Sequence, residues 1–209
     1  MPTDIDRFLR FRHHEALMVT LDEGLRPHTA PMGVEYVEAR VLVRPYVNTK
    51  TFHNLKANPE VSLNFTQDSR YFFEALLKPD RLRYRIGRCG RVPVIEGSFD
   101  LYIEGRVNLV DLSGERGVFV VYVSEAYEGP GSRLAFSRAN NALLEALVYY
   151  TKVKVMIREG FEGEVSDYLG LIKLNLNLVR RIGGRELVSM ADELEDVVKG
   201  LVGGALRQG

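Results

Sequence analysis

The stretch HTAPMGVEYVEARVLVRPYVNTKTFHNLKANPEVSLNFT, residues 28–66, decides the fold. Two runs within it, 28–37 and 40–46, are rich in β-branched and aromatic residues and are separated by a Glu-Ala turn, which is typical of paired antiparallel strands. A short helical pattern then begins, with Asn48 or Thr49 as its cap, and Asn58 and the following proline end it. The end of the stretch alternates between polar and apolar residues and returns to strand. This order predicts an antiparallel sheet with one short helix inserted early.

Further strand patterns lie on both sides of this stretch. One precedes it at 14–22, and two long ones, 98–112 and 116–127, follow it and are joined by a turn at Ser113-Gly114. Between them, 70–77 has a helical pattern, and the segment 78–97, rich in Pro, Gly and Arg, leaves the sheet. Six strands predict a small closed or partly closed Greek-key barrel, because closure removes exposed edges. An open sheet with a helical layer is the alternative.

The last third of the chain is helical. Its three patterns cover residues 132–153, 161–181 and 186–202, and Gly183-Gly184 separates the last two. The sequence therefore predicts a mainly β fold with a helical C-terminal appendage, divided into a domain over 1–130 and a helical region over 131–209. The final helix is too acidic to lie beside nucleic-acid phosphates, so we interpret the last two helices as a packing or dimerisation element.

Composition excludes several classes of protein. Lys+Arg and Asp+Glu both number 28 in 209 residues, and this balance disfavours a general nucleic-acid or anionic-membrane binder. Cys89 is the single cysteine, which excludes a disulfide framework or a multi-cysteine metal site and predicts a cytoplasmic protein with no metal. No apolar run is long enough to span a membrane, and residues 1–14 lack a signal-peptide pattern. Scarce Gln and abundant Arg and Glu suggest a thermophile.

The segment from Asn48 to Thr51 joins a strand end to a helix start. First-turn N–H groups of a helix lack internal partners and its dipole favours an anion, while the hydroxyls of Thr49 and Thr51 and the ammonium of Lys50 add direct donors. Asn54 lies one turn later on the same side. The segment predicts a phosphate site. The alternative interpretation is a plain helix cap with Lys50 in solvent.

A second motif lies within the strand 28–37. Pro31 lacks an N–H, so this strand is expected to be an edge, bulged, or opened toward a ligand. Together with Gly33 it would let a flat heteroaromatic ligand approach unpaired backbone amides between Ala30 and Gly33. The alternative is an ordinary edge strand with a bulge and Met32 in the core. His28 is expected to be a surface or core histidine rather than a catalyst.

The order of these pieces resembles the FMN-binding split barrel of flavin reductase-like proteins. Those proteins carry a Lys/Ser/Thr-Thr-x-x-Asn element after the third strand, followed by a Val-rich strand that ends in Asn. The APMGV and T-x-x-N-L pieces and the later segment FSRANNALLEAL, residues 136–147, are most similar to an archaeal branch whose members have no settled function. The matching residues are Thr49, Lys50, Thr51, Asn54 and Asn64.

The resemblance implies a six-stranded antiparallel split barrel that forms a homodimer, with FMN in the groove between subunits. The phosphate would lie at Asn48 to Thr51 and Asn54, and the isoalloxazine against Ala30, Pro31, Met32 and Gly33. Backbone N–H groups beside the ring would stabilise the reduced flavin, so no catalytic side chain is assigned. The implied function is an oxidoreductase acting on an unidentified small molecule, with a non-catalytic flavin-binding module as the alternative. No nicotinamide signature is present, so the electron donor and acceptor stay open.

An arginine-rich stretch lies within the excursion 78–97. Apolar residues interleave with its arginines, so it could form a β segment with one basic face that covers an anionic substrate. Contact with nucleic acid and a solvated, ion-paired loop are the alternatives, and the balanced net charge makes nucleic acid the weaker one. Nearby cations predict a lowered pKa for Cys89, unless it is an inert thiol. The arginines are Arg81, Arg83, Arg85, Arg88 and Arg91.

Overall fold

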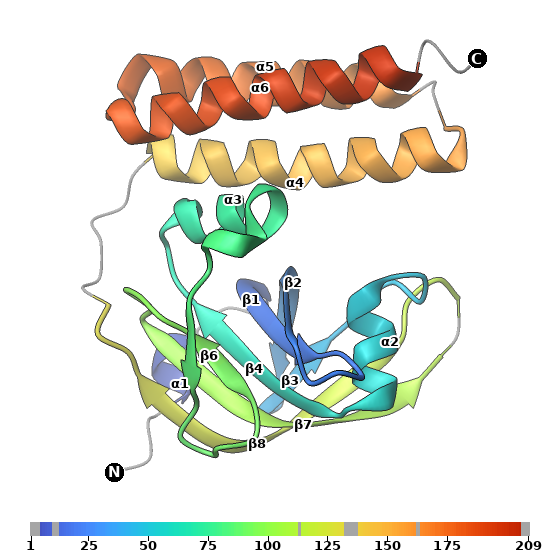
Figure 1. Ribbon diagram of the computed structural model, residues 1–209, viewed down its shortest axis with the longest axis vertical. Helices are drawn as coiled ribbons and strands as arrows, with labels where there is room; N and C mark the ends of the chain where they lie inside the picture. Colours follow the sequence, from blue (N-terminus) through green and yellow to red (C-terminus); the bar gives the residue numbers. More distant parts are fainter. Residues whose placement is uncertain (1–4, 10–12, 113, 132–137, 162–163, 206–209) are drawn as a thin grey trace. The chain divides into compact units, whose positions relative to one another are not determined.

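A computed structural model describes the chain except for residues 1–4, 10–12, 113, 132–137, 162–163 and 206–209. The chain divides into two compact units (Figure 1). The first comprises residues 1–67 and 74–133, and the second comprises residues 68–73 and 134–209.

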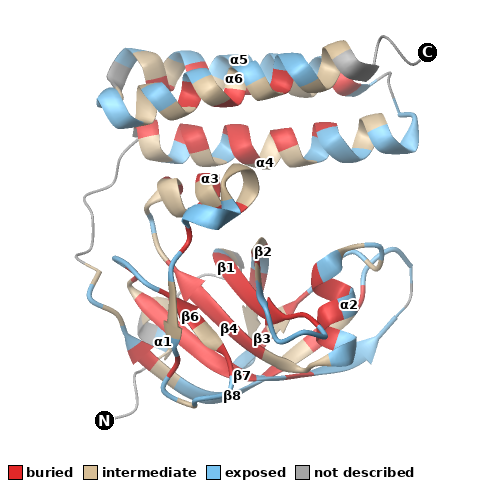
Figure 2. Cartoon of the chain, viewed as in Figure 1, coloured by how far each residue is buried: buried red, intermediate tan, exposed pale blue. Residues whose placement is uncertain are grey.

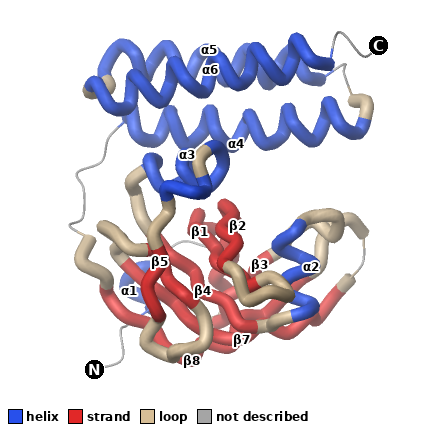
Figure 3. The backbone as a smooth tube through the Cα atoms, in the orientation of Figure 1, coloured by secondary structure: helices blue, strands red, loops and turns tan. Residues whose placement is uncertain are grey.

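The first unit is built around a closed barrel of antiparallel strands (Figure 3). Neighbouring strands follow the order β1-β2-β3-β8-β7-β4, and β4 pairs with β1 to close the barrel. The predicted six-stranded barrel is therefore confirmed, and the open sheet is excluded. The strands are β1 (His13–Leu21), β2 (Pro27–Val37), β3 (Arg40–Val43), β4 (Glu60–Phe65), β7 (Leu101–Asp111) and β8 (Val118–Glu128).

Alternating apolar residues from these strands fill the barrel. Ala16, Met18 and Leu63 are fully buried in its core, and Figure 2 shows buried positions along the strands. The short helix α2 (Lys50–Ala57) adds Phe52 and Leu55 to the same core. These two side chains fix the position of α2 and hence of its N-terminus.

The excursion between α3 (Ser69–Leu77) and β7 folds as a 3₁₀ turn, η1 (Pro79–Arg81), and a small hairpin of β5 (Tyr84–Ile86) and β6 (Pro93–Ile95). Hydrogen bonds fasten β6 to the outer face of the barrel. Ser62 Oγ donates to the Pro93 carbonyl (2.8 Å), and the Tyr102 hydroxyl donates to the Ile95 carbonyl (3.0 Å). The hairpin is therefore a separate two-stranded sheet anchored to the outside of the barrel.

The second unit consists mainly of three long helices, α4 (Arg138–Glu159), α5 (Val165–Ile182) and α6 (Arg185–Ala205). They correspond to the three helical patterns, although α4 continues past the predicted end at Val153. The predicted start of that pattern at 132–137, and Ser113 of the predicted hairpin turn, lie outside the described residues. Gly183 ends α5, and its N–H donates to the Val179 carbonyl (2.7 Å).

A short helix, α1 (Ile5–Phe8), precedes β1 in the first unit.

Within the described residues, no helix has the length and apolar character that crossing a membrane requires.

Candidate functional site

The N-terminus of α2 keeps two donors free. Thr49 caps the helix: its Oγ1 accepts a hydrogen bond from the Phe52 N–H (3.3 Å) and donates to the Tyr46 carbonyl (2.7 Å). The backbone N–H groups of Lys50 and Thr51 have no hydrogen-bond partner among the described residues. Free first-turn N–H groups at the positive end of a helix dipole are suited to an anion. The capping role of Thr49 and the anion-binding interpretation are thus compatible.

His28 connects this helix end to β2. Its Nε2 lies 3.4 Å from Thr51 Oγ1, so the two sequence motifs meet in space. Burial lowers the pKa of His28 below its ordinary value, the nearby Lys50 charge lowers it further, and Asp22 partly opposes them. The imidazole is therefore neutral at pH 7. Sequence reasoning treated His28 as an ordinary histidine, whereas the structure places it between the two motifs.

Lys50 and Asn54 lie on the other side of the helix end. They line a shallow depression of about 320 Å³ together with Asp22, Arg26 and His53. Lys50 Nζ lies 3.6 Å from Asp22 Oδ2, and Asn54 Nδ2 donates to Thr20 Oγ1 (2.9 Å). Hydrogen bonding from the Arg26 N–H lowers the pKa of Asp22, so its carboxylate is charged. It would compete with an anion at the helix end for the Lys50 ammonium.

The β2 segment that carries Ala30 to Gly33 has one open edge. Pairing with β3 begins only at Val34, so within the described residues 27–33 are paired with β1 alone. The register with β1 is continuous, with Pro31 opposite Leu17, so the expected edge is present and the expected bulge is not. Gly33 is exposed, whereas the Met32 side chain lies in the barrel core. Along this edge, backbone groups that face away from β1 are open to a ligand.

Asn64 and Asn48 lie apart from these contacts. Asn64 is fully buried on β4; its Nδ2 donates to the Leu17 carbonyl (3.0 Å), and its Oδ1 accepts from the Ile95 N–H (2.9 Å). It thus links β1, β4 and the hairpin, and β1 separates it from β2. Asn48 is exposed, immediately before the helix cap.

A second depression, of about 320 Å³, is lined in part by His28. Thr29 and Tyr84 line it, and their hydroxyls share a 2.7 Å hydrogen bond. Burial raises the pKa of Tyr84, which keeps its hydroxyl protonated. The sequence carries no signal for this pair, because the two residues meet only when the hairpin folds onto β2.

The arginine-rich hairpin does not form the single basic face that was one interpretation of its sequence. The Arg85 guanidinium lies 5.0 Å from the centre of the Tyr102 ring, and Arg88 lies 3.9 Å from that of Tyr127. Arg91 Nη1 lies 3.9 Å from Glu60 Oε1, and the Arg91 side chain is 55% exposed. The hairpin turns back on the barrel, where aromatic rings take up the guanidinium groups of Arg85 and Arg88, while Arg91 forms an ion pair, as the ion-paired interpretation predicted.

A buried carboxylate holds the turn of this hairpin. Glu104 is fully buried and accepts hydrogen bonds from the N–H groups of Arg88 (2.7 Å) and Cys89 (3.0 Å) and from the Tyr127 hydroxyl (2.8 Å). Burial and this carboxylate raise the pKa of Tyr127 to about 12. They also raise the pKa of Cys89, which supports the inert thiol over the lowered pKa. Gly87 is required here, because a Cβ at that position would overlap the Glu104 carboxylate.

Within the described residues, no group of three or more His, Cys, Asp or Glu side chains is arranged to hold a metal ion.

Comparison with known proteins places the chain among split barrels. The model of the DUF447 N-terminal domain, a protein family of unknown function, matches residues 14–102. A crystal structure of an FMN-bound DUF447 protein from Methanosarcina mazei superimposes with a TM-score of 0.75 at 22% identity, over 92% of this chain and 99% of that one. The split-barrel fold expected from the sequence is confirmed. No curated protein sequence matches the chain significantly.

More distant barrels share this fold. A 2-nitrobenzoate 2-nitroreductase from Pseudomonas fluorescens has a TM-score of 0.50 at 14% identity, over 61% of this chain and 73% of that one. A flavin reductase in complex with NADP+ has a TM-score of 0.50 at 18% identity, over 62% of this chain and 87% of that one.

Proposed function

We propose that this chain, whose residues 14–102 match the DUF447 N-terminal domain, is an FMN-binding oxidoreductase of flavin reductase-like type. One observation carries the proposal: the contact between His28 and Thr51 joins a helix end with two free N–H donors to an open strand edge. An FMN molecule has a phosphate at one end and a flat ring system at the other, and it needs a site of each kind within reach of one another.

The residues of the junction suit the phosphate. The N–H groups of Lys50 and Thr51 would donate to it, the hydroxyl of Thr51 would add a third hydrogen bond, and Lys50 would supply positive charge. Asn48, exposed beside the cap, lies within the same segment. Asn54 is engaged with Thr20, so we assign it to holding the helix against β1 rather than to direct contact with the phosphate.

The open edge of β2 suits the ring system. Ala30, Pro31 and Gly33 bring backbone close to the surface with little side chain in the way, and the Met32 side chain packs beneath them in the core. When bound, the flavin supplies hydride and electron transfer. The chain's own part is to bind the cofactor, to orient its ring along the strand edge and to direct backbone dipoles toward it.

A second subunit is part of this proposal. One open strand edge covers a flat ring on one side only, and a homodimer with the flavin at its interface would cover the other. Exposed apolar side chains on the outer surface of β7 and β8 support such an interface, including Val110 (55% exposed) and Tyr122 (58%). We place the protein in the cytoplasm, where the free thiol of Cys89 would stay reduced.

The first experiment is the visible absorption spectrum of the purified protein, followed by heat release and chromatography of any coloured ligand. We expect a flavin spectrum and released FMN. Titration of apoprotein should give a dissociation constant at least about 100-fold lower for FMN than for riboflavin, because only FMN carries the phosphate. Colourless protein that fails to bind added FMN would overturn the proposal. Equal affinity for FMN and riboflavin would contradict the proposed phosphate site.

Turnover is tested separately on FMN-loaded protein under anaerobic conditions. We expect NADH or NADPH to bleach the flavin absorbance, and reoxidation by a small-molecule acceptor to restore it. Bound flavin that no nicotinamide reduces would instead favour a non-catalytic flavin-binding module.

A further inference from the structure

Helix α5 carries a second apolar stripe that faces solvent. Its core side is formed by buried residues such as Ile172 and Leu176. On the opposite side, Leu171 is 38% exposed and Leu174 is 67% exposed, and Leu178 follows at helical spacing. An amphipathic surface helix normally needs one apolar stripe, so a second one marks a contact surface.

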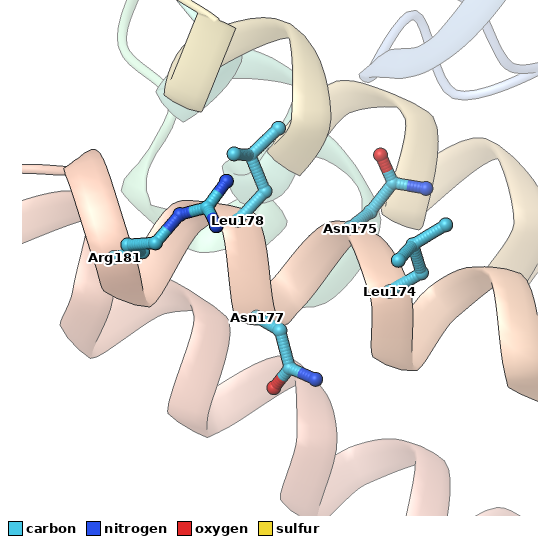
Figure 4. Close-up of a pocket in the computed structure, with 5 residues that line it drawn as sticks. All are labelled: Leu174, Asn175, Asn177, Leu178 and Arg181. Carbon is cyan, nitrogen blue, oxygen red and sulfur yellow. The ribbon is translucent and has the colours of Figure 1, made fainter.

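This stripe borders a hollow in the surface of the helical unit. The hollow has a volume of about 450 Å³, and Figure 4 shows the side chains of α5 that line it: Leu174, Asn175, Asn177, Leu178 and Arg181. Two leucines flanked by amide and guanidinium groups form the combination of apolar centre and polar rim that is typical of protein interfaces.

The apolar stripe has a charged residue at each end, and the two charges are of opposite sign. Asp167 and Arg181 lie seven residues before and after Leu174, which places all three on one face of the helix. Both charged residues are exposed, and neither forms an ion pair within the part of the chain that the structure describes. The face is therefore acidic at its start, apolar in its middle and basic at its end.

We propose that this face binds α5 of a second copy of the chain, antiparallel, about a two-fold axis at Leu174. Symmetry then brings together residues at equal distances from Leu174. Arg181 meets Asp167 of the partner subunit, about 10 Å from the axis. Leu178 meets Gly170 of the partner subunit, and because glycine has no side chain the two helices can approach closely.

A parallel arrangement is disfavoured by the same charges, because it would place each Asp167 against its own copy. One helix face is smaller than the roughly 800 Å² per partner of a stable interface, so the association is expected to be reversible. The proposal does not depend on flavin binding: this face pairs whatever assembly the barrels form, and it doubles that assembly's mass.

The test measures the solution mass of the full-length, FMN-loaded protein by sedimentation velocity across micromolar concentrations. We expect Leu174→Glu to halve the mass at concentrations where the natural protein is assembled. The matched control is Leu25→Glu in the β1–β2 turn, at a leucine 68% exposed, and its mass should not change. A mass unaffected by Leu174→Glu would overturn the proposal, and so would an equal effect of Leu25→Glu.

Charge reversal tests the antiparallel register. Asp167→Arg and Arg181→Asp should each weaken association about tenfold, because each places like charges opposite one another. The variant that carries both substitutions should restore association, since the acidic and basic ends of the face then exchange places and opposite charges meet again in the antiparallel pair only. Failure to restore it would overturn this register. The FMN content per chain, read from the same samples, separates this outcome from a failure of the flavin site.

Discussion

The junction at the start of α2 and the hairpin of β5 and β6 are both cationic in sequence, and for both one interpretation was contact with an anion. In the hairpin, Arg85 and Arg88 lie against tyrosine rings, and the N–H groups of the turn donate to Glu104. In the junction, the N–H groups of Lys50 and Thr51 have no hydrogen-bond partner in the described part of the chain. The comparison predicts that donors left without partners identify a binding site better than a concentration of positive charge does.

The largest expected effect concerns the hairpin. Glu104→Ala removes the acceptor of three hydrogen bonds and leaves the hydroxyl of Tyr127 and two N–H groups without it. We expect a loss of about 3 kcal/mol in the free energy of unfolding. Urea unfolding followed by circular dichroism measures it. Glu104→Gln, which keeps one acceptor oxygen, should cost clearly less, and FMN affinity of the folded fraction should stay unchanged in both variants. A large loss of affinity with unchanged stability would reverse the roles of the two regions.

The junction should respond in the opposite way. Replacing Thr49 and Thr51 together by Ala should raise the dissociation constant for FMN about 30-fold, or about 2 kcal/mol, because hydrogen bonds to a charged group are lost. Stability should fall by only about 1 kcal/mol, mainly through loss of the Thr49 cap. Fluorescence titration and thermal unfolding of the same samples measure both quantities. Riboflavin, which lacks the phosphate, is the control ligand. Similar losses for FMN and riboflavin would support a plain helix cap.

Local patterns predicted most of the fold. Alternation identified the strands of the barrel, and Thr49 and the Asn58-Pro59 pair predicted both ends of α2, because these features depend on near neighbours in sequence. The exit of 78–97 from the sheet was also predictable from its Pro and Gly content. Its internal hairpin was not, since the three-residue strands β5 and β6 are too short to show alternation.

The site was less predictable than the fold. Adjacent residues such as Lys50 and Thr51 share a motif that sequence alone reveals. The contacts of His28 with Thr51, of Lys50 with Asp22 and of Tyr84 with Thr29 join separate elements, so they exist only once the barrel closes and the hairpin folds back. The same limit explains Cys89, whose neighbouring arginines suggested a lowered pKa while the distant Glu104 raises it.

A pH dependence would sharpen the comparison, because His28 contacts Thr51 at the junction. In the free protein burial and the Lys50 charge lower the pKa of His28, and a phosphate dianion bound beside Thr51 would raise it. Between these two pKa values FMN binding takes up a proton, so affinity should rise as pH falls through that window. We expect about a threefold increase from pH 7.5 to 6 relative to His28→Asn. The FMN phosphate itself titrates near pH 6, but equally with both proteins. Parallel curves for the two would show that His28 does not face the phosphate.

The smallest expected effect comes from Asp22, whose carboxylate lies beside Lys50. Asp22 holds Lys50 and accepts from the N–H groups of Gly24 and Arg26. Asp22→Asn keeps an acceptor oxygen for the turn but removes the charge that competes with phosphate for Lys50. FMN affinity should therefore rise about twofold at low salt, and the gain should vanish near 0.5 M salt, where exposed charges are screened. Titrations at the two salt concentrations test this. The result also bears on why an acid lies beside Lys50: the Asp22 carboxylate holds the Lys50 ammonium in place, 3.6 Å away, before a phosphate arrives. A fall in affinity on removing the carboxylate would mean that this placement outweighs the competition.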